Sequence, residues 1–113
     1  MKTTIITGPQ GSGKTKKALE LIGLGKQFII IDASDVSKKV PYENIHDNCI
    51  IIIDCIRNSY EISQIRSLFS SGTITFRKTY DERPKDYIVS ELYLLSQYYD
   101  LANYYGTVEH VKL

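Results

Sequence analysis

Three runs of residues have the length and the apolar, β-branched composition of strands, at residues 3–7 (TTIIT), 27–32 (QFIIID) and 49–54 (CIIIID). A last strand is predicted over residues 107–113 (TVEHVKL), where the side chains alternate. Isoleucine runs of this kind suit strands that are buried on both faces, as in a parallel sheet between helices. Because strand and helix patterns alternate along the chain, the sequence predicts an α/β fold.

The first segment with helical spacing is KTKKALELIG, which begins at Lys14. It places Ala18, Leu19 and Ile22 on one face, with lysines on the opposite face. Gly23 follows as a natural C-terminal stop. The pattern predicts an amphipathic helix directly after the first strand.

A second helix is predicted over SYEISQIRSLFSSG, with Ser59 as its N-terminal cap and Gly72 as its stop. Its apolar face is formed by Ile62, Ile65, Leu68 and Phe69. A short helix through VSKKV, capped by Asp35 and ended by Pro41, is also expected between the second and third strands.

The stretch TITFRKTYDERPKDY alternates briefly and turns at residues 81–84, which predicts a small hairpin or a protruding loop. The stretch after it has two interpretations. It is either one long helix over residues 86–105, or a strand through ELYLLSQ followed by a shorter helix that ends at Gly106. The strand is favoured, because the sheet otherwise lacks a core strand beside residues 49–54.

Length and composition suit one compact domain over residues 1–113, because 42% of the residues are hydrophobic. A net charge of +1 gives no global attraction to nucleic acid or membrane. Cys49 and Cys55 flank one strand, too far apart for a disulfide, and are expected to be buried free thiols. No segment reaches the roughly 18 apolar residues of a membrane helix, so we expect a cytoplasmic protein without membrane contact.

The segment GPQGSGKT fits the pattern G-x-x-x-x-G-K-[ST] and lies between a predicted strand and a predicted helix. Its glycines let the backbone curl so that N–H groups point at anionic oxygens, and the helix N-terminus adds partial positive charge. In such a loop Lys14 reaches the β and γ phosphates, and the Thr15 hydroxyl binds Mg²⁺. The predicted nucleotide-binding residues are Gly8, Pro9, Gln10, Gly11, Ser12, Gly13, Lys14 and Thr15.

On this motif the N-terminal half of the chain resembles the P-loop NTPase superfamily. The resemblance implies a three-layer fold in which a mainly parallel sheet of about five strands lies between helices. It also implies ATP and Mg²⁺ as ligands, with Asp54 in the Walker B role, holding Mg²⁺ through water. No N-K-x-D guanine motif is present, which favours ATP over GTP.

From Asp54 onward, the succession of strand, helix, basic hairpin and strand looks like the AAA+ and superfamily 3 helicase-type ATPase cores. This resemblance implies that Gln97, or Ser96 beside it, is a sensor of the γ phosphate or the attacking water. Such motors grip nucleic acid with the hairpin, where this chain has Arg77, Lys78, Arg83 and Lys85. Tyr80 and Tyr87 lie nearby and could stack on bases, although three acidic residues dilute the basic cluster.

The residue after Asp54 is a cysteine where many such ATPases have a catalytic glutamate. An ordinary thiol is mostly protonated at pH 7, so Cys55 is a poor general base. Glu61 is a weak substitute, and Arg57 could act as an arginine finger toward a neighbour in an oligomer. We therefore expect a protein that binds Mg²⁺-ATP and hydrolyses it slowly, only with a partner, or not at all.

Two alternative functions remain open at this point. A small-molecule kinase of the nucleoside or nucleotide type would use Asp32 and Asp35, after the second strand, to bind the acceptor. A non-hydrolysing binding module would use the nucleotide only to switch contact with a partner. Transfer of phosphate to an acceptor distinguishes the kinase from the motor core.

Overall fold

One sheet organises the protein, whose computed structural model describes residues 1–36, 44–78, 80–100 and 108–113. The strands of this sheet are β1 (Lys2–Thr7), β2 (Ile29–Asp32), β3 (Cys49–Ile56), β4 (Thr73–Phe76), β5 (Lys85–Ser96) and β6 (Glu109–Lys112). The helices in the described residues are α1 (Lys14–Ile22), α2 (Ala33–Val36) and α3 (Ser59–Leu68). None of these helices is long and apolar enough to span a membrane.

The strands follow the order β2-β3-β5-β1-β6, and every neighbouring pair in this order is parallel. Strand β4 pairs in the antiparallel sense with the first part of β5. The predicted α/β class and the mainly parallel sheet are therefore confirmed, with six strands in the described part of the chain. Because β5 lies between β1 and β3, the carboxyl ends of these three strands meet at one edge of the sheet.

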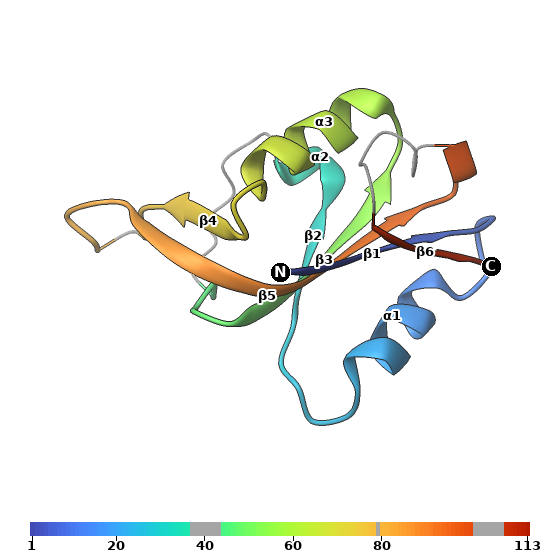
Figure 1. The fold of residues 1–113 in the computed structure, drawn as a ribbon, viewed down its shortest axis with the longest axis horizontal. Coiled ribbons are helices and arrows are strands. Elements are labelled where there is room, and N and C mark those ends of the chain that lie inside the picture. Colours follow the sequence, from blue (N-terminus) through green and yellow to red (C-terminus); the bar gives the residue numbers. More distant parts are fainter. Residues whose placement is uncertain (37–43, 79, 101–107) are drawn as a thin grey trace.

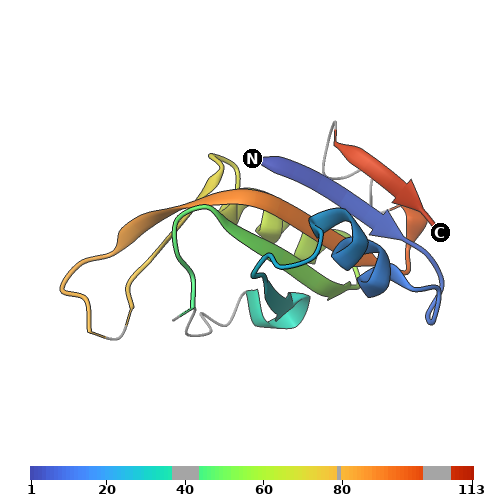
Figure 2. The same ribbon diagram turned by 90° about the horizontal axis from the view of Figure 1, so that it is seen from below.

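Helices cover both faces of the sheet, α1 on one side and α2 with α3 on the other (Figures 1 and 2). The α3 side holds the larger core, in which Ile62, Ile65 and Phe69 pack on the strands. On the α1 side, Ala18 and Ile22 pack in a smaller core. The isoleucine run of β3 serves both: its residues alternate between the two cores and are at most 6% exposed.

Two strands are longer than the sequence predicts. Strand β3 continues past Asp54 to Ile56, which is 1% exposed and still pairs with β5. Strand β5 begins at Lys85 because its first part is one arm of the hairpin with β4. The long helix over residues 86–105 is therefore wrong, and the strand through ELYLLSQ is confirmed. The shorter helix expected before Gly106 falls on residues 101–107, outside the described residues.

The predicted helix caps need correction. Asn58, not Ser59, caps α3: its side-chain oxygen accepts a hydrogen bond of 2.9 Å from the backbone N–H of Glu61. The helix ends at Leu68, before the Gly72 turn. For α2, the backbone N–H of Ser34 donates to the Asp32 carboxylate at 2.9 Å, so Asp32 rather than Asp35 takes the capping position. The remainder of the VSKKV segment lies outside the described residues.

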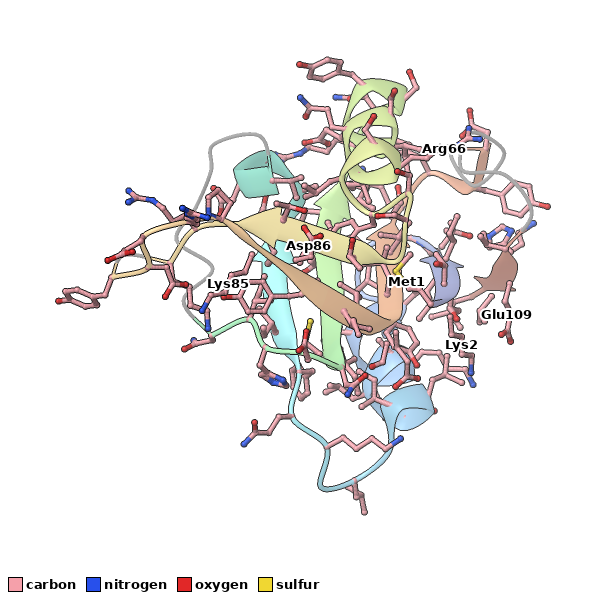
Figure 3. All side chains as sticks on the ribbon, turned by 60° about the vertical axis from the view of Figure 1, so that its left-hand side comes forward. Met1, Lys2, Arg66, Lys85, Asp86 and Glu109 are labelled. Carbon is pink, nitrogen blue, oxygen red and sulfur yellow. The ribbon has the colours of Figure 1, made fainter. Side chains whose placement is uncertain are left out.

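The β4–β5 hairpin protrudes from the body of the protein, as Figure 1 shows. Lys85 and Asp86 lie on this hairpin (Figure 3), and the Thr75 hydroxyl donates to the Asp86 carboxylate across it. Tyr80, near the turn, is 97% exposed. The predicted hairpin is confirmed.

The core on the α3 side leads to a stability prediction. Phe69 is 1% exposed, and truncating a buried Phe leaves a cavity, so we expect Phe69→Ala to lower the free energy of unfolding by about 3–5 kcal/mol. Tyr60, which is 69% exposed on α3, is the aromatic control. Tyr60→Ala should change the free energy of unfolding by about 0.5 kcal/mol or less. Urea unfolding followed by circular dichroism measures both, and equal losses would contradict this packing.

Candidate functional site

The backbone of the loop between β1 and α1 depends on its glycines. Gly11 and Gly13 have φ angles of 81° and 87°, a left-handed conformation that favours glycine. Gly8 is required for a different reason: a Cβ there would lie 2.6 Å from the Ser12 hydroxyl oxygen and 3.0 Å from the Leu113 Cβ. The three motif glycines therefore meet steric demands of this one turn.

Lys14 folds back over this loop from the first turn of α1. Its Nζ atom donates to the carbonyl oxygens of Gly8 and Pro9, at 2.9 and 3.1 Å. The N-terminal amides of α1 have no side-chain cap, because the N-cap residue is Gly13, and the first turn holds no acidic residue. The Ser12 hydroxyl is buried and has no hydrogen-bond partner in the described part of the chain. The N-terminus of α1 therefore has no side-chain cap, and the positive charge of Lys14 is held over the loop by two of its carbonyls.

A pocket of about 490 Å³ opens beside the loop, and three elements line it. The loop and α1 provide Lys14 and Thr15, the end of β3 provides Asp54, and the end of β5 provides Gln97. All four were predicted as site residues from the sequence, and they line this one pocket. Of the other loop residues, Gln10, Gly11 and Gly13 also line it, whereas Gly8, Pro9 and Ser12 shape the turn.

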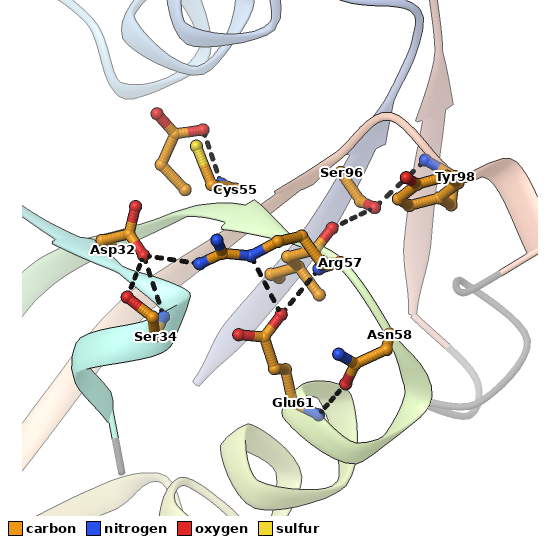
Figure 4. A network of polar contacts seen from close by, with 10 residues as sticks. Asp32, Ser34, Cys55, Arg57, Asn58, Glu61, Ser96 and Tyr98 are labelled. Carbon is orange, nitrogen blue, oxygen red and sulfur yellow. Dashed lines mark hydrogen bonds and ion pairs between the residues drawn. The ribbon is translucent and has the colours of Figure 1, made fainter. Parts of the chain in front are cut away.

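A bulge in β3 sets the position of Asp54. Ile53 pairs with Leu94 and Ile56 with Ser96, so Asp54 and Cys55 together face a single residue of β5. Cys55 has a φ of 62°, which is left-handed and unusual for a residue with a side chain. Its backbone N–H donates to the Asp54 carboxylate at 2.8 Å (Figure 4). The bulge thus orients the carboxylate that lines the pocket.

Cys55 cannot replace a catalytic glutamate. It is a free cysteine and, contrary to the sequence expectation, it is exposed, whereas Cys49 is buried. Desolvation, followed by the negative charges of Asp54 and Asp32, raises the pKa of the Cys55 thiol. A thiol that stays protonated at neutral pH takes no proton from water.

Arg57 lines the same pocket and is held between two carboxylates, as Figure 4 shows. Its guanidinium donates to Asp32 at 3.0 Å, and its Nε atom lies 3.7 Å from the Glu61 carboxylate. Hydrogen bonds from the Ser34 side chain and backbone, and then the Arg57 charge, lower the pKa of Asp32, so that Asp32 stays ionised. The sequence suggested Arg57 only as a finger toward a neighbouring chain, but it lines the pocket of its own chain.

Glu61, considered from the sequence as a substitute base, is engaged elsewhere. Its carboxylate accepts the backbone N–H of Arg57 at 2.7 Å and forms the ion pair with the Arg57 side chain. Its side chain is only 12% exposed and is not among the residues that line the pocket. Glu61 therefore stabilises the start of α3.

Ser96 and Gln97, the two residues considered for a sensor role, differ sharply. Ser96 is 2% exposed; its hydroxyl donates to the Ile56 carbonyl at 2.7 Å and accepts from the Tyr98 N–H at 3.1 Å. Its backbone carbonyl accepts the N–H of Gly8 at 3.2 Å. Ser96 therefore connects the loop to the end of β3, whereas the exposed Gln97 is the residue available to a ligand.

The pocket has the donors that a magnesium–phosphate complex requires. In the described residues, no cluster of three or more His, Cys, Asp or Glu side chains could hold a metal ion without other ligands. Mg²⁺ commonly uses one or two protein ligands together with waters and substrate phosphates. The Thr15 hydroxyl and the Asp54 carboxylate line one pocket and fit that pattern.

The basic residues of the hairpin lie away from this pocket, and three of them have partners within the hairpin. Arg77 donates to the Asp81 carbonyl at 3.3 Å, and Lys85 lies 3.8 Å from the Asp81 carboxylate. The Lys78 ammonium lies 5.2 Å from the centroid of the Tyr87 ring. The cluster is therefore a partly neutralised basic surface on a protruding arm.

The contrast between Ser96 and Gln97 leads to a prediction. Ser96→Ala leaves the Ile56 carbonyl and the Tyr98 N–H without this partner, so we expect a loss of about 1–3 kcal/mol in the free energy of unfolding. Gln97→Ala at the exposed neighbour should change it by about 0.5 kcal/mol or less. Thermal and urea unfolding test both variants, and a Gln97→Ala loss as large as that of Ser96→Ala would refute the assignment.

Comparisons with known proteins find no relative of this chain. The chain matches no protein-family model, no curated protein and no solved structure. The loop after β1 and the bulge at the end of β3 line one pocket, which is the candidate functional site of this chain.

Proposed function

We propose that the protein is a P-loop ATP-binding protein that takes up ATP with Mg²⁺ and hydrolyses it slowly, or only when a partner supplies what the chain lacks. The observation that carries this proposal is the common pocket of Lys14, Thr15 and Asp54. Lys14 and Thr15 begin α1, whereas Asp54 lies near the end of β3, far away in sequence, so their meeting is a property of the fold.

Phosphate binding is supported by the backbone and by charge. The left-handed glycines turn the loop, and the uncapped N-terminus of α1 adds the positive end of the helix dipole. Three cationic side chains and one carboxylate line the pocket, namely Lys14, Lys16, Arg57 and Asp54. This balance favours a polyanionic ligand that brings a divalent cation.

The strand order supports the helicase-type branch of the P-loop superfamily over a protein that shares only the loop motif. Because β5 lies between β1 and β3, the exposed Gln97, which directly follows β5, lies between the loop and Asp54, where a sensor of the γ phosphate belongs. Slow hydrolysis follows from the chemistry of the two residues considered as a general base, Cys55 and Glu61. The Cys55 thiol has a raised pKa, and Glu61 is bonded to Arg57.

Nucleotide binding tests the proposal first. Lys14→Ala removes a charged donor to the phosphates, which is worth about 1.5–3 kcal/mol, so affinity for Mg²⁺-ATP should fall about 10–100-fold. The control is Lys26→Ala, at an exposed lysine outside the pocket, which should leave affinity unchanged. Isothermal titration calorimetry measures both. Absence of binding by the unmodified protein would refute the proposal.

The same preparations test turnover. Phosphate release by the purified chain alone should stay close to that of Lys14→Ala, because no carboxylate base is available in the described site. Release far above that of the variant would refute slow hydrolysis. Transfer of phosphate to a nucleoside, instead of release, would favour the kinase. Asp32, which a kinase would use to bind the phosphate acceptor, accepts a hydrogen bond from the Arg57 guanidinium.

A nucleic-acid partner is the second part of the proposal, and it rests on the protruding basic hairpin. If the hairpin binds single-stranded DNA, Lys78→Ala combined with Arg83→Ala should reduce the slope of log affinity against log salt by about 1.4, or 0.7 for each lost phosphate contact. A matched double variant, Lys2→Ala with Lys26→Ala, should keep the slope. Fluorescence anisotropy with labelled DNA measures it, and equal slopes for both variants would refute DNA binding by the hairpin.

A further inference from the structure

The Arg57 side chain is unusual in this site, because it is cationic, lines the nucleotide pocket and is already paired. It is 53% exposed, and its guanidinium reaches Asp32 at the end of β2. Asp32 and Asp54 are paired neighbours in the register of β2 and β3. Arg57 therefore spans the end of the pocket that lies beyond Asp54, on the side away from the loop.

That position fits the last phosphate of a nucleotide chain. Lys14 and Thr15 lie at the start of α1, next to the loop, and Asp54 follows on β3. If bound, Mg²⁺ would be held by the Thr15 hydroxyl and the Asp54 carboxylate, and it would neutralise charge on the phosphates beside them. Continuing from Asp54 along the carboxyl edge of the sheet toward β2, the next cationic side chain that lines the pocket is Arg57, so the phosphate farthest from the loop would be the one nearest to it.

The two carboxylates that hold Arg57 are not equivalent. Glu61 is 12% exposed and accepts the backbone N–H of Arg57, a bond that does not depend on the position of the arginine side chain. Asp32 is 42% exposed and also accepts from the Ser34 hydroxyl and N–H, at 2.7 and 2.9 Å. Asp32 thus keeps two donors if the guanidinium leaves, whereas Glu61 keeps the arginine stem in place.

Exchange of Asp32 for a phosphate is energetically accessible. An ion pair between two exposed side chains contributes little to stability, because both charges are well solvated when they separate. A guanidinium forms stronger, bidentate hydrogen bonds with a phosphate in a pocket that excludes part of the water. The pair with Asp32 is therefore weak enough to be displaced by a terminal phosphate.

We infer that Arg57 binds the terminal phosphate of the nucleotide within its own chain, and that Asp32 holds its side chain ready when no nucleotide is bound. This inference rests on the proposed nucleotide-binding function and adds the residue that distinguishes a triphosphate from a diphosphate. Arg57 then contributes to affinity only when the third phosphate is present. Asp32 competes with that phosphate.

The test compares two ligands on one set of variants. The triphosphate probe is the ATP analogue whose β–γ bridging oxygen is replaced by NH, and the diphosphate probe is ADP, both with Mg²⁺. Arg57→Ala should weaken binding of the triphosphate about 10–100-fold and that of ADP less than about twofold. Arg57→Lys keeps the positive charge but loses the bidentate geometry of the guanidinium, so its loss of triphosphate affinity should be intermediate. Calorimetric titration gives all the affinities.

Asp32→Asn supplies an independent variant, because asparagine has the same shape and still accepts the bonds from Ser34. It should strengthen triphosphate binding up to about fivefold, since the competing charge is removed, and leave ADP binding unchanged. Arg66→Ala, on the far part of α3 (Figure 3), is the matched arginine control and should change neither affinity. Thermal unfolding of each variant checks that the fold is kept.

The outcomes separate this inference from the proposed function. If the unmodified protein binds neither probe, the nucleotide-binding function fails and the role of Arg57 fails with it. If it binds both probes but Arg57→Ala weakens them equally or not at all, only the role of Arg57 is refuted. A loss of triphosphate affinity in Asp32→Asn would also refute it, because Asp32 would then assist the phosphate instead of competing with it.

Discussion

The backbone and hydroxyl of Ser96 join the two halves of the site, and the rest of the arrangement depends on this junction. Its carbonyl accepts the N–H of Gly8, the first residue of the loop, at 3.2 Å. Its hydroxyl donates at 2.7 Å to the carbonyl of Ile56, the last residue of β3. The residue is buried, so these bonds have little competition from water. Through them the loop and the bulge that bears Asp54 keep one relative position.

That junction exists because β5 is inserted between β1 and β3. Parallel pairing aligns Thr7 of β1 with Ser96 and, on the other side, Ile56 of β3 with Ser96. Isoleucines of β3 and leucines of β5 fill the cores on both faces, and a shift of register by one residue would turn them to the wrong faces. Core packing therefore sets the spacing between the glycine-rich loop after β1 and Asp54.

The pocket combines positive charge with one carboxylate. Lys14 and Arg57 line it, and Asp54 provides the carboxylate. The residue after Asp54 is a cysteine with a positive φ angle and a raised pKa, and the Glu61 carboxylate accepts the backbone N–H of Arg57. The pocket therefore offers charged groups to a ligand, whereas neither Cys55 nor Glu61 is available as a general base.

Local patterns of residues are enough to predict the glycine-rich loop, α1, the isoleucine strands, the hairpin and the residues Lys14, Thr15 and Asp54. These features depend on neighbouring residues, such as glycines that allow positive φ and apolar runs that need two buried faces. The folded chain is needed to show which strand separates β1 from β3, that β3 bulges at Cys55, and that Arg57 reaches Asp32 across 25 positions of sequence. These features come from pairings between distant segments, and no local pattern of residues encodes the neighbour that a strand end will meet.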